Sequence, residues 1–165
     1  RGMLIERRIR KLDVPRADVF RAFTSLGGET GWLYLNYLWH IRGWMDRVVG
    51  GPGYRRGRPQ RENLRVGDAL DFWRVEAIEP NHLLRLRAEM KLPGKGWLQY
   101  EVTSDDAGQS KLIQTAYFAP KGLFGYVYWY AIFILHKLLF NGIIDQIVQR
   151  AKANKQQTET HRVEV

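Results

Sequence analysis

The chain has 165 residues, a length typical of one domain and sufficient to bury a hydrophobic core. Its composition, 45% hydrophobic and 13% aromatic, excludes a disordered chain and indicates an aromatic-rich interior. There is no cysteine, which excludes disulfides, thiolate metal sites and a cysteine nucleophile. The net charge of +9 predicts a basic surface.

That positive charge is concentrated in two stretches, residues 7–11 and 55–65. An ordinary solvated surface explains them, and so would contact with nucleic acid, anionic lipid or an acidic protein. Nucleic-acid modules usually interleave stacking aromatics with the basic residues, whereas 55–65 has only Tyr54 nearby, so we expect no specific nucleic acid. A module that binds anionic membrane surfaces in a salt-dependent way stays open.

The N-terminal residues carry a charge at every second or third position, which leaves no apolar core for a signal peptide. We therefore expect a cytoplasmic protein. The chain opens on Arg1 and not on methionine, which leaves room for an upstream domain. The four histidines are scattered, with no pair at ligand spacing, so we expect no metal and no cofactor.

Residues 4–12 predict an edge strand with Ile5 and Ile9 on one side among charges. Asp13 is then the expected cap of a short amphipathic helix, with Pro15 in its first turn. This helix would end at two consecutive glycines.

A second helix is predicted over residues 35–49, and the glycine-rich stretch 50–58 stops it. The stretch resembles a phosphate-binding loop only superficially, because it lacks the Gly-Lys-Ser/Thr ending. It would place Arg56 or Arg58 beside an anionic group at a cavity mouth, and an exposed structural loop is the alternative.

The middle of the chain predicts consecutive antiparallel strands. Residues 69–78 form a β-prone run whose inward face the pattern leaves open. Residues 83–91 alternate, with leucines on one side and charges on the other. The next strand turns Leu98, Tyr100 and Val102 inward, and residues 111–118 complete the sheet.

A long helix is predicted over residues 124–154, because no proline interrupts them. Its first half is apolar all round, which indicates deep burial or lipid. Lys137, Asn141, Asp145 and Gln149 form a polar stripe opposite an apolar one, and this pattern favours a core helix over a transmembrane span.

The order of elements resembles that of the START-like (SRPBCC) helix-grip superfamily. Residues 42–58, 67–75, 88–97 and 117–130, with His136 and Phe140, are similar to a family of unknown function within it. The resemblance implies an α+β fold, in which a curved antiparallel sheet of about six or seven strands surrounds the long C-terminal helix, with two short helices after the first strand. It implies a single domain over 1–154, a polar tail over 155–165, and an upstream NAD(P)-binding domain of the extended short-chain dehydrogenase kind.

The same resemblance implies a ligand cavity between the sheet and the long helix, and His136 projects from the apolar side of that helix. His136 is the candidate catalytic residue or ligand anchor, and a core histidine with one hydrogen bond is the alternative. The candidate ligand-binding residues are Arg56, Trp73, Arg74, Glu89, Trp97, Tyr100 and Tyr117.

For Arg74 and Glu89 an exposed cross-strand ion pair is the stronger interpretation. The leading functional hypothesis is binding of a small apolar or aromatic molecule. The alternative is an enzyme of the cyclase type, similar to polyketide cyclases, or of the hydrolase type, with His136 and a cavity tyrosine as acid and base.

Overall fold

The computed structural model describes residues 2–26, 36–51, 58–59, 63–105 and 109–163. These residues form three helices and six strands, with the helices and strands largely segregated along the chain as in an α+β fold. In chain order they are β1 (Leu4–Leu12), α1 (Arg16–Thr24), α2 (Asn36–Val48), β2 (Ala69–Leu70), β3 (Trp73–Glu79), β4 (Leu83–Ala88), β5 (Gly94–Ser104), β6 (Ser110–Pro120) and α3 (Gly122–Val163).

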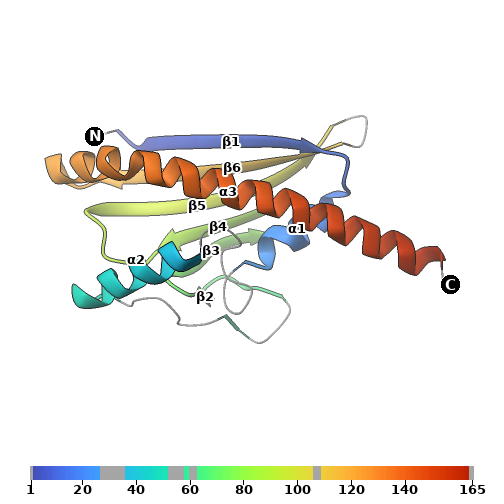
Figure 1. The fold of residues 1–165 in the computed structure, drawn as a ribbon, viewed down its shortest axis with the longest axis horizontal. Helices are drawn as coiled ribbons and strands as arrows, with labels where there is room; N and C mark the ends of the chain where they lie inside the picture. Colours follow the sequence, from blue (N-terminus) through green and yellow to red (C-terminus); the bar gives the residue numbers. More distant parts are fainter. Residues whose placement is uncertain (1, 27–35, 52–57, 60–62, 106–108, 164–165) are drawn as a thin grey trace.

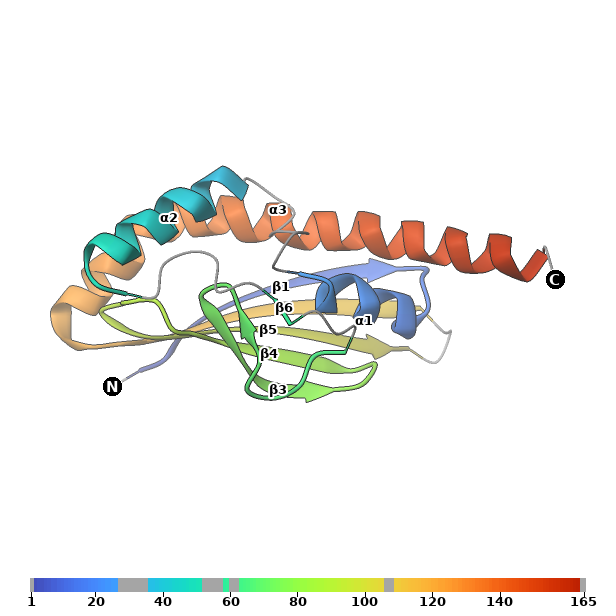
Figure 2. The same cartoon turned by 90° about the horizontal axis from the view of Figure 1, so that it is seen from below.

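The described strands form one antiparallel sheet in the order β1-β6-β5-β4-β3-β2, in which the β1–β6 pair joins strands that are far apart in the sequence. All three helices lie on one side of the curved sheet, and α3 runs along its length (Figures 1 and 2). We call the helix-covered side the inner face. This arrangement confirms the predicted helix-grip fold.

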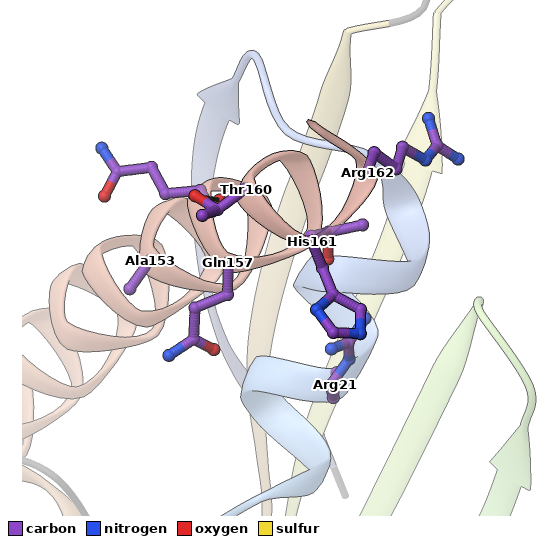
Figure 3. A pocket seen from close by; sticks show the side chains of 8 residues that line it. Arg21, Ala153, Gln157, Thr160, His161 and Arg162 are labelled. Atoms are coloured by element: carbon purple, nitrogen blue, oxygen red, sulfur yellow. Dashed lines mark hydrogen bonds between the residues drawn. The ribbon is translucent and has the colours of Figure 1, made fainter. Parts of the chain in front are cut away.

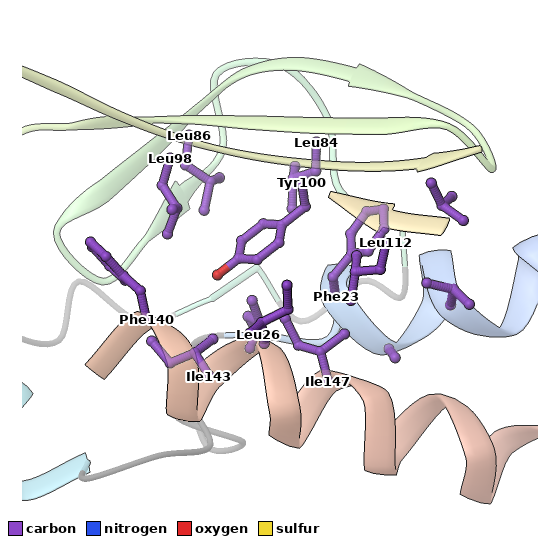
Figure 4. Packing of buried hydrophobic residues seen from close by; sticks show 14 of the residues in the cluster. Phe23, Leu26, Leu84, Leu86, Leu98, Tyr100, Leu112, Phe140, Ile143 and Ile147 are labelled. Carbon is purple, nitrogen blue, oxygen red and sulfur yellow. The ribbon is translucent and has the colours of Figure 1, made fainter. Parts of the chain in front are cut away.

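The hydrophobic core lies between the inner face and the helices α1 and α3. Leu98, Tyr100 and Val102 are fully buried there, as their alternation along the sequence predicts. In Figure 4 the Tyr100 ring reaches from β5 toward α3, among leucines of the sheet and isoleucines of the helix. The Phe23 ring of α1 stacks on it, with ring centroids 5.7 Å apart.

The single strand predicted over residues 69–78 is wrong, because the chain reverses within it. Asp71 adopts a positive φ of 52°, and Leu70 pairs with Trp73 across the turn. Aspartate tolerates this left-handed conformation better than most residues. The turn also settles the inward face of β3: Trp73 and Val75 are buried against the core.

The predicted start of the first helix and the predicted end of the long helix both need correction. The residue that precedes α1 is Pro15, with no side-chain cap, so Asp13 does not cap this helix. Asp13 instead accepts a hydrogen bond from Lys155 of α3, through its backbone carbonyl. Asn154 likewise donates to the Asp18 carbonyl. Helix α3 continues to Val163, through the described part of the expected polar tail.

The expected deep burial of the first half of α3 is also wrong. By length and composition this helix could cross a membrane. Only 28% of its most apolar window is buried inside the protein, which is too little for a deeply buried helix. Its inner side packs in the core through Leu139, Ile143 and Ile147, as expected for a core helix. Toward its start, Ile134 is 81% exposed.

We expect Gly125→Ala to destabilise the protein by about 2 kcal/mol, because an added methyl has no room. A Cβ at this position would lie 2.5 Å from the Pro93 carbonyl oxygen and 2.9 Å from Pro120 Cα, both on the backbone. Urea unfolding of both proteins measures the loss. Gly2→Ala is the control, since nothing lies within 4 Å of that position, and equal effects would contradict the steric account.

Candidate functional site

A row of polar side chains crosses the inner face of the sheet. Arg8 of β1 pairs in register with Gln114 of β6, which in turn pairs with Tyr100 of β5. Gln114 Nε2 donates to the Tyr100 hydroxyl at 3.1 Å, and both side chains are fully buried. Burial raises the pKa of Tyr100, so its phenol stays protonated.

The guanidinium of Arg8 joins this row to α3. Its side chain is only 6% exposed and forms an ion pair with Glu6 on the same strand. Its Nε donates to Asn141 Oδ1 at 2.8 Å, and its charged end lies 5.5 Å from the centre of the Phe140 ring. Burial lowers the pKa of Arg8, although a guanidinium remains charged near neutral pH.

His136 stands on the side of α3 that faces the sheet, between two aromatic rings. Its ring centre is 6.0 Å from that of Trp129 and 5.3 Å from that of Phe140. Burial, with the positive charges of Arg42 and Arg8, lowers the pKa of His136 to about 4. The imidazole is therefore neutral at physiological pH.

These residues form the inner polar cluster, which we define as Glu6, Arg8, Tyr100, Gln114, His136 and Asn141. Within the described part of the chain, four of its buried polar atoms have no hydrogen-bond partner: Glu6 Oε2, Arg8 Nη1, Gln114 Oε1 and His136 Nδ1. Buried polar groups are normally satisfied, so several unsatisfied ones in one region mark a candidate site.

Of the predicted site residues, only Tyr100 and His136 belong to this cluster. Trp73 is buried on the inner face but lies on β3, beyond β4. Its ring contacts Phe72, with centroids 5.7 Å apart. Trp73 is therefore part of the core wall and not of the polar row.

Four other predicted residues lie on the opposite face of the sheet. Arg74 and Glu89 form a two-fold hydrogen-bonded ion pair there, at 2.9 and 3.1 Å, as the exposed-pair interpretation expects. Trp97 donates to Glu76 at 3.3 Å and pairs in register with Tyr117. These side chains cannot line a space between the sheet and α3.

Arg56 lies outside the described residues. The nearby Arg58 is described, and it donates to the backbone carbonyls of Thr24 and Leu26 at 2.6 and 2.9 Å. Half-buried in this way, Arg58 holds the end of α1.

Sequence reasoning missed Glu6, Arg8, Gln114 and Asn141. For Glu6 and Arg8 the signal is an inverted alternation on β1, where Ile5 and Ile9 are exposed while Glu6 and Arg8 face inward. Gln114 stands out in the same way as a glutamine among inward-facing apolar positions of β6.

Apart from the inner polar cluster, a hollow lies at the far end of α3, against α1 (Figure 3). It is open to solvent, has a volume of about 760 Å³ and is lined by polar side chains, among them Arg21, Gln157, His161 and Arg162. Within the described residues no group of three histidine, aspartate or glutamate side chains comes together as a metal site would require.

Comparison with solved structures shows the same fold at low sequence identity. The Zhui aromatase/cyclase from a Streptomyces species superposes with a TM-score of 0.53 at 10% identity, covering 92% of this chain and 94% of that one. A point mutant of norcoclaurine synthase from Thalictrum flavum, in complex with a transition-state analogue, gives 0.57 at 8% identity, covering 93% and 97%. No curated protein matches the sequence significantly. Over residues 3–143 the sequence matches the family described as "Protein of unknown function (DUF2867)", and the chain belongs to that family.

Proposed function

We propose that the inner polar cluster binds a small apolar or aromatic molecule that carries at least one oxygen. The observation that carries the proposal is the set of four buried, unpartnered polar atoms that the sheet and α3 bring together. Leaving such atoms unsatisfied costs about 1–3 kcal/mol each, so a protein that keeps them has a use for them.

The chemistry of these atoms describes the ligand. Arg8 Nη1 donates hydrogen bonds, which suits a carbonyl, carboxylate or phenolate oxygen. Gln114 Oε1 and Glu6 Oε2 accept them, which suits a hydroxyl group. The rings of Trp129 and Phe140, with the leucines of β4 and β5, offer apolar contact for the rest of the molecule.

The pKa of His136 favours binding over acid–base catalysis. A general base is most effective when its pKa lies near the working pH, whereas a pKa of about 4 makes the imidazole a weak base at neutral pH. A neutral ring serves well as a hydrogen-bond partner for a ligand. The solved structures of an aromatase/cyclase and a norcoclaurine synthase share the fold, and a cyclase-type reaction remains the alternative function.

We further propose that this domain presents its ligand to an upstream NAD(P)-binding domain of the dehydrogenase kind. Expression of the longer chain with a nicotinamide cofactor would test that arrangement. Cofactor-dependent change of a molecule bound in the inner polar cluster is the supporting result.

Native mass spectrometry of the purified protein, compared with its denatured mass, is the first test. We expect a co-purifying molecule of a few hundred daltons, the size that small-molecule sites in proteins commonly hold. The fluorescent aromatic anion 8-anilinonaphthalene-1-sulfonate then serves as a defined probe. His136→Phe keeps the ring between Trp129 and Phe140 but removes Nδ1, and we expect it to weaken probe binding about tenfold.

The probe also adsorbs to exposed apolar surface, which both proteins share, so the difference between them reports the inner site. Gln149→Glu, an exposed position on the same helix, is the control and should bind like the parent protein. If His136→Phe also binds like the parent protein, the inner polar cluster is not the binding site. If a natural ligand is found, retained affinity with lost turnover in His136→Ala would instead support the enzyme.

A further inference from the structure

Helix α2 turns its apolar side away from the protein. Five large apolar residues at helical spacing are exposed on it: Tyr37, Ile41, Trp44, Met45 and Val48. The opposite side holds the helix in place, because Asp46 is buried and accepts a hydrogen bond from the Lys91 backbone at 2.7 Å. Trp44, two residues before Asp46 and so on the other side of the helix, is 68% exposed.

The first half of α3 presents a second apolar stripe. Its members recur every three or four residues and are all exposed: Leu123, Val127, Tyr130, Ile134 and Leu138. The other side of the same helix carries Trp129, Leu139 and Phe140, which are buried toward the sheet. The stripe therefore points away from the sheet.

The two stripes belong to one end of the molecule. Figure 2 shows α2 and the first half of α3 on the same side of the sheet, at the end away from the C-terminus. We call the ten residues of the two stripes the apolar platform. Exposed apolar areas of this extent on a soluble protein usually mark an interaction surface.

The exposed charges that α2, Lys121 and residues 122–144 contribute are all positive. Arg47 and Lys137 are exposed on the two helices, and Lys121 is exposed immediately before α3. In α2 and in residues 122–144 the only carboxylate is that of Asp46, which is buried. A surface of this kind is complementary to a partner that is apolar and negatively charged.

We propose that the apolar platform docks this protein on the surface of an anionic lipid bilayer. Apolar helix faces with tryptophan and tyrosine and a cationic border are typical of segments that lie in the membrane interface. The inner side of α3 packs on protein, so the helix would lie in the plane of the bilayer. This proposal does not rest on the proposed ligand site.

The same charges argue against a second copy of the chain as the occupant. A two-fold interface would place Arg47, Lys121 and Lys137 of both copies around one apolar contact, with no exposed carboxylate on α2 or residues 122–144 to pair them. Like charges facing one another in this way destabilise a dimer, whereas anionic headgroups neutralise them.

Sedimentation with lipid vesicles tests the proposal. We expect the protein to bind vesicles containing about 30% phosphatidylserine far better than vesicles of phosphatidylcholine alone, and to release them as salt is raised from about 50 to 500 mM. Ile134→Glu should lower the partition coefficient at least about tenfold. Lys137→Gln should lower it about fivefold, with no loss on neutral vesicles.

Gln149→Glu is the matched control, because it makes the same charge change at an exposed position of α3 beyond the platform and should stay within about twofold of the parent protein. Absence of binding to anionic vesicles at low salt would overturn the proposal, as would binding that Ile134→Glu leaves unchanged. Analytical ultracentrifugation tests whether the platform instead binds a second copy of the chain. A parent protein that is dimeric, and that Ile134→Glu converts to a monomer, would assign the platform to that second copy. His136→Phe should bind vesicles normally, which separates this test from that of the ligand site.

Discussion

Glu6→Gln is expected to destabilise the protein by about 3 kcal/mol, because it leaves the buried guanidinium of Arg8 without its counter-charge. The side chains of Glu6 and Arg8 are only 16% and 6% exposed, so water does little to compensate. The hydrogen bond to Asn141 and the nearby Phe140 ring remain, but neither carries a charge. Urea unfolding near pH 7 measures the loss.

Asp145→Asn is the matched control, since Asp145 of α3 pairs with Arg10 of β1 at 2.8 Å between the same two elements, where the two side chains are 56% and 37% exposed. That substitution should cost less than about 1 kcal/mol. The double variant Glu6→Leu, Arg8→Leu should be more stable than Glu6→Gln, because no buried charge is left alone. Equal losses for the buried and the exposed pair would show that Arg8 is hydrated in the folded protein.

A double variant as stable as the parent protein would carry a further implication. It would mean that the Arg8–Glu6 pair contributes little to folding, and that its retention reflects the donor and acceptor atoms it presents at the inner face. Loss of probe binding in the same variant would connect the two observations.

The fold could be predicted from the sequence where one face of an element is buried and the other is wet. The alternation predicted over residues 83–91 is confirmed as far as Ala88, where β4 ends, and the inward set beginning at Leu98 is confirmed too. A one-residue slip would turn the buried leucines of these strands to the opposite face. The glycines that follow α2 ended it as predicted, since Gly50 adopts a positive φ of 75°.

The candidate site was harder to predict, because it breaks that same rule. Side chains of adjacent strand residues point to opposite faces, so Trp97 and Leu98 cannot both line a cavity. The same parity separates Tyr117 from the buried Phe118. On β1 the pattern is inverted, because Ile5 and Ile9 face outward while Glu6 and Arg8 face inward. The pairing of Arg8 with Gln114 shows where these inward charges lie.

Packing against the rest of the protein also determines which side of each apolar helix is buried. A segment that is apolar all round indicates burial or lipid, and the polar stripe of the long helix favours burial for its first half. The structure buries one side of it and leaves residues such as Tyr130 and Ile134 exposed. Helix α2 presents the same inversion, because its buried side carries Asp46 while Trp44 is exposed. The periodicity of the sequence predicts neither inversion. It shows that a helix has an apolar side, but not whether the protein or another molecule covers that side.

Acidification is expected to destabilise the protein through His136. Its pKa is about 4 in the folded protein and about 6.5 in an unfolded chain, so the unfolded state takes up the proton first as pH falls. The contribution of His136 is therefore fully present above about pH 6.5, and up to about 3 kcal/mol of stability is lost by about pH 4.

The measurement is the free energy of unfolding in urea from pH 7.5 down to about 4 for the parent protein and for His136→Phe. The carboxylates and the other three histidines titrate in both proteins, so the difference between the two curves isolates His136. That difference should shift in favour of the variant as pH falls, most steeply between about pH 6 and 4.5. Parallel curves would mean that His136 is protonated as readily in the folded protein as in water. Its pKa would then lie in the range in which an imidazole acts as a general acid or base. A difference of the expected sign would leave a neutral ring, held by Trp129 and Phe140, whose open nitrogen is available for hydrogen bonding to a ligand at every physiological pH.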